Sequence, residues 1–207
     1  MKLSFKPGKN GKIHIYIDDE YKMTADDTFW FSEQWHNLKE INDEELAELE
    51  SSVSSRRAFL SGADMLTRRM HGKEELYRKL YRKYSKEAAR AAVEKLESLS
   101  LLDDENYANM LASDLYTYKK YGLSRVRQEL LRRGIDRDIA DEAVKRLDKD
   151  DINRIILLLQ TKYQNKLNDR NDIEKVKASL MRLGYSYSDI RAALAEINTD
   201  AEEFYNE

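Results

Sequence analysis

The sequence has no cysteine, only one proline and only seven glycines among its 207 residues. The absence of cysteine excludes disulfide bonds, thiolate metal ligands and a cysteine nucleophile, and it is compatible with a reducing compartment. Proline and glycine are the residues that most disfavour helix, so their scarcity favours helix along most of the chain. We therefore expect a mostly α protein.

Long apolar runs are absent as well. No stretch approaches the ~18 apolar residues of a membrane span, and the N-terminus, MKLSFKPGKNGK, lacks the apolar segment of a signal peptide. We therefore expect a cytoplasmic protein that makes no membrane contact.

Patterns typical of catalysis are scarce. His14, His36 and His71 share no helical spacing, which argues against a histidine metal site. The stretch KPGKNGK does not have the residue order of a phosphate-binding loop. The acidic clusters at 103–105 and 148–151 could hold Mg²⁺ for a nuclease, but helix starts also favour acidic residues, and we prefer that interpretation. We expect no catalytic residue, no metal and no cofactor.

Charge is unevenly distributed around a net value of -3. Residues 1–55 carry 12 acidic and 6 basic residues, whereas residues 56–99 carry 6 acidic and 12 basic residues. A mildly acidic total argues against an obligate nucleic-acid-binding protein. The positive potential of residues 56–99 nevertheless suits an anionic partner.

The first thirty residues follow the period of a β-strand. Ile13, Ile15 and Ile17 alternate with other residues, and the sequence DDE provides a turn before a second strand. This pattern predicts a β-hairpin, with residues 2–6 as a candidate third strand. A lone hairpin is marginally stable, so it must pack on other residues, and we favour a core role for the aromatics that follow over a platform for stacking bases. These aromatics are Phe29, Trp30, Phe31 and Trp35.

One helical pattern occurs three times at intervals of fifty residues, in segments 71–85, 121–135 and 171–185. Two aligned columns are apolar and a third is entirely arginine. The columns are Leu76, Val126 and Val176; Leu80, Leu130 and Leu180; and Arg82, Arg132 and Arg182. A unit of this size cannot bury its apolar stripe alone. The pattern therefore predicts tandem three-helix repeats, three in number, stacked into an elongated curved array.

We divide the chain at changes of composition. Residues 1–55 would form the β-hairpin region with short helices, 58–102 repeat 1, 103–149 repeat 2, 150–198 repeat 3, and 199–207 a C-terminal tail. The serine-rich stretch 51–55, SSVSS, is the candidate linker before the repeats.

Helix ends can be placed from their capping residues. The predicted N-caps are Asp104, Ser124, Asp136 and Asp172, and the predicted stops are Gly134 and Gly184. Repeat 1 lacks the glycine before Tyr84, so the connection between its second and third helices should be tighter or differently shaped.

The second helix of repeat 1 is basic and rich in tyrosine. Its functional interpretation is a surface for an anionic partner, either phosphates or an acidic protein face, with Tyr77, Tyr81 and Tyr84 adding contact area. The alternative is a solvated face in which Glu74 and Glu75 pair with the cations four residues later. The repeated arginines leave the same choice open. The candidate partner-binding residues are Arg78, Lys79, Arg82, Lys83, Arg125, Arg127, Arg132, Arg133 and Arg182.

Residues 101–147 closely resemble the central unit of RecX, the bacterial regulator of the RecA recombinase, in the order of the phrases LLDDENYA and YGLSRVRQELLRRGI. Residues 72–80, GKEELYRKL, are similar to the first unit of that family. Residues 11–26, GKIHIYIDDEYKMTAD, resemble the β segment of members from Gram-positive bacteria, and the third unit is similar in weaker form. The resemblance covers nearly the whole chain.

The resemblance implies a regulator of homologous recombination, DNA repair and the SOS response. It implies binding in the groove of the RecA–DNA filament, and modulation, usually inhibition, of ATP hydrolysis, strand exchange and repressor cleavage. The expected partner is therefore the RecA filament, with weak direct contact to DNA, and we expect a monomer. The alternative from the residues alone is a helical-repeat module that acts directly on DNA through the basic residues of 56–99.

Overall fold

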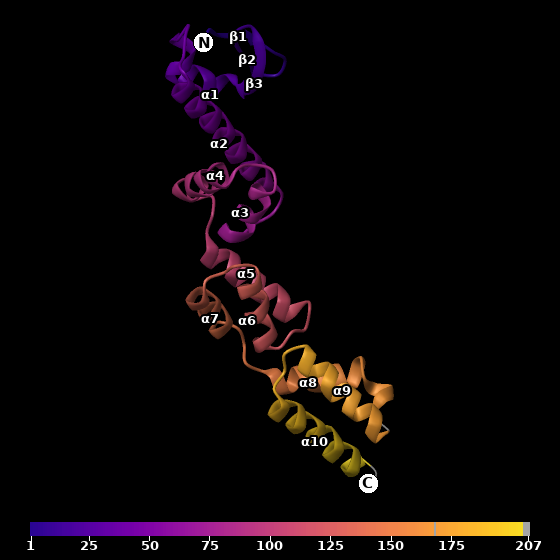
Figure 1. Ribbon diagram of the computed structural model, residues 1–207. Helices are drawn as coiled ribbons and strands as arrows, with labels where there is room; N and C mark the ends of the chain where they lie inside the picture. The colour runs from indigo at the N-terminus through magenta and orange to yellow at the C-terminus, as the bar shows by residue number, and fades with distance from the viewer. Residues whose placement is uncertain (168, 205–207) are drawn as a thin grey trace. The chain divides into compact units, whose positions relative to one another are not determined.

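The computed structural model describes residues 1–167 and 169–204, with side chains described as far as residue 197 (Figure 1). The chain divides into two compact units, Met1–Asp103 and Asp104–Glu207. The first unit contains β1 (Leu3–Pro7), β2 (Lys12–Ile17), β3 (Glu20–Asp26), α1 (Asp27–Ser32), η1 (Gln34–Asn37), α2 (Asp43–Arg68), α3 (Lys73–Tyr81) and α4 (Lys86–Ser98). The second contains α5 (Asp104–Thr117), α6 (Leu123–Arg132), α7 (Arg137–Lys145), α8 (Asp151–Thr161), η2 (Gln164–Lys166), α9 (Arg170–Arg182) and α10 (Tyr187–Phe204).

The N-terminal residues form an antiparallel sheet with the strand order β1-β2-β3, so both the predicted hairpin and the third strand are confirmed. Ile15 is fully buried on the face that packs on the following helices. Trp30 and Trp35 join the same core, at 0% and 2% exposure. Phe29 is partly buried against it, but Phe31 is 53% exposed, so the predicted core role is wrong for Phe31.

Helix α2 runs without interruption through the stretch that was predicted as a linker. It begins with a capping box, in which the Asn42 side chain accepts from the Glu45 N–H at 2.9 Å and Glu45 accepts from the Asn42 N–H at 2.8 Å. The linker prediction for 51–55 is wrong, because Val53 is buried at 3% exposure. Serine disfavours helix only slightly, and burial of Val53 outweighs that preference.

Repeat 1 is built from the second half of α2 together with α3 and α4, which share one apolar core. The connection from α3 to α4 differs from its counterparts, as predicted. The N–H groups of Lys83 and Tyr84 both donate to the Leu80 carbonyl, at 2.9 and 3.0 Å, and no residue there has a positive φ. The Ser85 hydroxyl then caps α4 by accepting from the Ala88 N–H.

Helices α5 to α7 and α8 to α10 form the other two helix triplets, packed by contacts between α5, α6 and α7 and between α8, α9 and α10. The two apolar columns found in the sequence are buried in all three triplets, with at most 1% exposure. They are Leu76, Val126 and Val176, and Leu80, Leu130 and Leu180. Gly134 and Gly184 end α6 and α9 with φ of 85° and 94°, which confirms both predicted stops.

The predicted N-caps are confirmed only in part. Asp136 caps α7 by accepting from the Asp138 N–H, as expected. The others are wrong because the helices begin earlier than predicted. Asp104 already lies in the first turn of α5, α6 follows Gly122 without a side-chain cap, and α9 is capped by Asp169 rather than Asp172.

At the C-terminal end, α10 continues into the predicted tail as far as Phe204, and residues 205–207 lie outside the described residues. None of the helices that the structure describes has the length and apolar character needed to cross a membrane.

Candidate partner-binding surface

The outward face of α3 carries Arg78 and Lys79, because Leu76 and Leu80 turn the opposite face into the core. Arg78 donates to Glu74 at 2.8 Å, and Lys79 lies 3.4 Å from the Glu75 carboxylate. These are the pairs at a spacing of four residues that the sequence indicated. Arg78 and Lys79 are therefore held by their own helix.

Arg82 and Lys83 follow directly at the end of α3. Both are exposed, and neither side chain forms an ion pair or hydrogen bond with any residue that the structure describes. Beside them, Tyr77 and Tyr81 stack with ring centroids 5.9 Å apart and an interplanar angle of 2°, and Tyr81 is 55% exposed. The end of α3 thus offers two cations and an aromatic pair to a partner.

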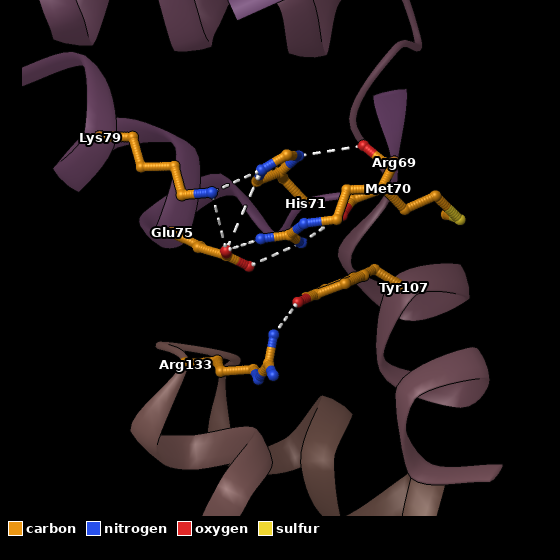
Figure 2. Close-up of polar contacts among 7 residues, drawn as sticks. All are labelled: Arg69, Met70, His71, Glu75, Lys79, Tyr107 and Arg133. Atoms are coloured by element: carbon orange, nitrogen blue, oxygen red, sulfur yellow. Dashed lines mark hydrogen bonds and ion pairs between the residues drawn. The ribbon is translucent and has the colours of Figure 1, made fainter. Parts of the chain in front are cut away.

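A polar cluster at the start of α3 surrounds a buried histidine (Figure 2). His71 is 4% exposed, and its Nδ1 lies 3.0 Å from the Arg69 carbonyl, so this nitrogen carries the proton and donates. Its Nε2 then accepts from the Lys79 ammonium at 2.9 Å. The Glu75 carboxylate forms ion pairs with both Lys79 and Arg69. Burial lowers the pKa of His71, and the neighbouring cations Arg69 and Lys79 lower it further.

This cluster predicts a pH dependence in the stability of the first unit. Since the pKa of His71 is lower in the folded state, the unfolded state binds more protons, and stability should fall as the pH drops through the unfolded pKa of about 6.5. Hydrogen exchange of the α3 amides between about pH 7.5 and pH 5.5 measures this loss. His71→Gln keeps a donor and an acceptor but does not titrate, so an equal loss in that variant would contradict the assignment.

In repeat 2, four of the candidate arginines have intramolecular partners. Glu129 on α6 is 7% exposed, and its carboxylate oxygens form ion pairs with Arg125 Nη2 at 2.8 Å and with Arg132 Nη2 at 2.7 Å. Arg127 reaches Asp141 on α7, with Nη2 3.1 Å from Oδ2, and the guanidinium holds the pKa of Asp141 below its usual value. These contacts tie α6 to itself and to α7.

Arg133 donates to the hydroxyl of Tyr107 on α5 at 2.9 Å, a contact that Figure 2 also draws. Arg182, at the end of α9, is exposed and forms no ion pair with any described residue. In the aligned arginine column, Arg82 and Arg182 thus project freely, whereas Arg132 is paired. Of the nine candidates, the three available cations are Arg82, Lys83 and Arg182.

In the acidic cluster 148–151, two carboxylates contact neighbouring side chains. Asp150 accepts from the Asn153 amide at 2.8 Å, and Asp151 lies 3.4 Å from the Tyr116 hydroxyl. Within the described part of the chain, no group of three or more histidine or acidic side chains is placed to hold a metal ion.

The second and third helix triplets, both in the second unit, make a close backbone contact, here called the joint, that the sequence did not reveal. The Gly122 N–H donates to the Leu183 carbonyl at 2.8 Å, and a Cβ on Gly122 would lie 2.5 Å from the Gly184 carbonyl oxygen. A Cβ on Gly184 would lie 2.4 Å from that of Arg125. Tyr185 adds a hydrogen bond from its hydroxyl to the Lys120 carbonyl at 2.9 Å. Both glycines are needed because two backbones touch here.

A second contact of the joint joins the end of α5 to α8. The Arg154 guanidinium lies 3.5 Å from the centroid of the Tyr116 ring and donates to the Tyr116 carbonyl, while the Tyr116 hydroxyl donates to the Asp148 carbonyl. Burial raises the pKa of Tyr116 to about 12, so the phenol keeps its proton. Burial also raises the pKa of Asp151, although Arg154 acts against it.

Comparison with known proteins agrees with this architecture. Two segments match family models: residues 58–96 match "RecX, first three-helix domain", and residues 103–144 match "RecX, second three-helix domain". A regulatory protein RecX from Caldanaerobacter subterraneus is 27% identical over 190 residues, which cover 91% of this chain and 95% of that protein. The regulatory protein RecX of Clostridioides difficile is 24% identical over 199 residues, with 95% and 94% covered.

The fold has a solved counterpart. A crystal structure of a regulatory protein RecX has a TM-score of 0.70 at 22% identity, and the match covers 94% of this chain and 98% of the other. The family resemblance seen in the sequence is therefore confirmed: two consecutive segments match RecX three-helix domains, and the chain is similar to regulatory RecX proteins over nearly its whole length.

Proposed function

We propose that this chain regulates the RecA recombinase by binding in the groove of the RecA–DNA filament, where it inhibits ATP hydrolysis and strand exchange. The observation that carries the proposal is the pair of consecutive RecX three-helix domains at 58–96 and 103–144, in a chain whose relatives are named regulatory protein RecX.

The repeated surface supports a polymeric partner. Two apolar columns are buried in every repeat, so the same outward positions recur along the chain. Arg82 and Arg182 occupy equivalent positions, and neither pairs with a residue that the structure describes. A filament presents the same surface at each subunit, and equivalent cations on the first and third repeats suit such a target.

The direct test is strand exchange by RecA in the presence of increasing amounts of the protein. We expect inhibition at concentrations below that of RecA, because a protein bound in the groove blocks more than one subunit. Unchanged strand exchange at equimolar protein would contradict the proposal.

Charge reversal at Arg82 and Lys83 tests whether these cations contribute to the inhibition. We expect Arg82→Glu combined with Lys83→Glu to raise the concentration needed for half inhibition about tenfold or more, since each reversed contact is worth about 1 kcal/mol. Lys9→Glu combined with Lys39→Glu makes the same change of charge at exposed lysines of the first unit and should leave inhibition within about twofold. Equal inhibition by the two double variants would remove these cations from the binding surface.

A second candidate function is direct binding of nucleic acid, favoured by the exposed cations Arg82 and Lys83 and by the exposed Tyr81, which stacks on the half-buried Tyr77. It predicts tight binding to DNA without RecA and a steep loss of affinity with salt, because each phosphate contact releases counterions. Weak binding that charge reversal at Arg78, Arg82 and Lys83 leaves unchanged would exclude it.

A further inference from the structure

An open cavity of about 440 Å³ lies in the first unit, between the sheet and α2. Strand β2 contributes Lys12 and His14, strand β3 contributes Tyr21 and Thr24, and α2 contributes Arg57. Lys12 and His14 alternate with the buried isoleucines of β2 and therefore face away from the core. Thr24 pairs with His14 across the strands, and Tyr21 pairs with Tyr16 beyond an irregularity in the register. The volume falls within the ~300–1,000 Å³ of small-molecule sites.

The charge available in this cavity is positive. Lys12 and Arg57 are exposed, and neither forms an ion pair or hydrogen bond through its side chain with any residue that the structure describes. Asp26, the acidic residue of the wall, is already engaged by Arg56 through two hydrogen bonds of 2.9 and 3.0 Å. Two cations thus remain for an anion.

The cavity also presents an aromatic ring in a fixed place. Tyr21 is 60% exposed, yet it contacts His14 and Tyr16 with ring centroids 6.1 and 6.0 Å apart. Its hydroxyl lies 3.0 Å from the Thr24 hydroxyl, which also bonds to His14 Nδ1 at 2.8 Å. A ring held in this way retains surface on which a planar group can stack.

We propose that this cavity binds a free nucleotide, with the phosphates at Lys12 and Arg57 and the base stacked on Tyr21. Two cations neutralise the phosphates of one nucleotide, and guanidinium and ammonium groups are the usual phosphate ligands in proteins. A nucleic-acid strand instead requires a positive groove that follows its backbone, whereas one stacking ring and two cations suit a single nucleotide. None of the residues that line the cavity belongs to α3 or to the candidate partner-binding residues.

The test is calorimetric titration of the full chain with ADP, and with pyrophosphate and adenosine as fragments. We expect saturable binding of ADP with a Kd between about 10 µM and 1 mM, tighter than that of either fragment. Absence of saturable binding of ADP, or binding only of a single-stranded oligodeoxythymidylate, would overturn the proposal.

Variants locate the site. Lys12→Ala combined with Arg57→Ala should weaken ADP binding about tenfold or more, because hydrogen bonds to charged groups are lost. Tyr21→Ala should weaken it about fivefold through lost stacking, while Tyr21→Phe should stay within about twofold. Arg90→Ala changes an exposed arginine of α4 outside the cavity and serves as the control. Undiminished binding in the Lys12/Arg57 double variant would refute this location.

Discussion

Replacing Gly122 by alanine is expected to lower the free energy of unfolding of the second unit by about 2–4 kcal/mol. The φ of Gly122 is -71°, so alanine brings no conformational strain there. Its Cβ, however, would lie 2.5 and 2.6 Å from the carbonyl oxygen and carbon of Gly184, which are backbone atoms that cannot rotate away. Amide hydrogen exchange in α6 and α9 measures the loss within this unit.

Two other glycine variants separate the contributions. Gly134→Ala places alanine at a positive φ of 85°, away from the Gly122–Gly184 contact. It should lower the free energy of unfolding by about 1–2 kcal/mol. Gly184→Ala combines a φ of 94° with a Cβ placed 2.4 Å from that of Arg125, so it should be the most damaging of the three. If Gly122→Ala is no more destabilising than an exposed substitution, the two backbones are not in contact.

Replacing Arg154 by alanine is expected to destabilise the same unit by about 3 kcal/mol. The variant removes the cation from the Tyr116 ring and the donor from the Tyr116 carbonyl. It also leaves Asp151, whose side chain is 14% exposed, without the arginine that acts against its burial. Removing one partner of such a pair is more damaging than removing both. The midpoint of urea unfolding, followed through the exchange of α8 amides, measures the effect.

The control is the double variant Arg154→Ala with Asp151→Asn, which should recover at least about 1 kcal/mol because no carboxylate remains buried. The destabilisation caused by Arg154→Ala should also depend on pH. Burial raises the pKa of Asp151, so its ionised form opposes folding above that pKa, and the opposition is relieved as the pH falls through it. The deficit of Arg154→Ala should therefore shrink between about pH 7 and pH 4.5. A deficit independent of both pH and Asp151→Asn would assign the loss to packing alone.

The repeat pattern could be predicted from the sequence because it depends on contacts within each repeat. Leu80, Leu130 and Leu180 recur at a fixed interval, and each is fully buried in its own helix triplet. The glycine stops were equally local, because a positive φ after a helix favours glycine almost regardless of surroundings. The missing glycine before Tyr84 likewise changed the turn in which Lys83 and Tyr84 donate to the Leu80 carbonyl.

Predictions that required exact helix boundaries or long-range packing were less successful. Ser124 and Asp172 have good capping side chains, but α6 and α9 begin before them. The serines of 51–55 suggested a linker, yet Leu49, Val53 and Ala58 keep one face of α2 buried through that stretch. Tertiary packing decided the second case, and local preference could not reveal it. At α9 another local cap, Asp169, is used instead of Asp172.

On the candidate surface, contacts within one helix could be predicted from the sequence, whereas contacts between helices could not. Pairs four residues apart, such as Arg78 with Glu74, could be read from spacing. Arg127 with Asp141 and Arg133 with Tyr107 join different helices, so the sequence alone could not show that these arginines are engaged. The contact of Gly122 with Gly184 depends on how two repeats meet, and a glycine before a helix gives no signal of it.

Binding of this chain to the recombinase filament is measured by co-sedimentation with RecA assembled on single-stranded DNA. The same DNA without RecA, at the same salt concentration, is the control. We predict that the protein sediments with the filament and stays in the supernatant with DNA alone. Equal sedimentation with both, or with neither, would contradict the account.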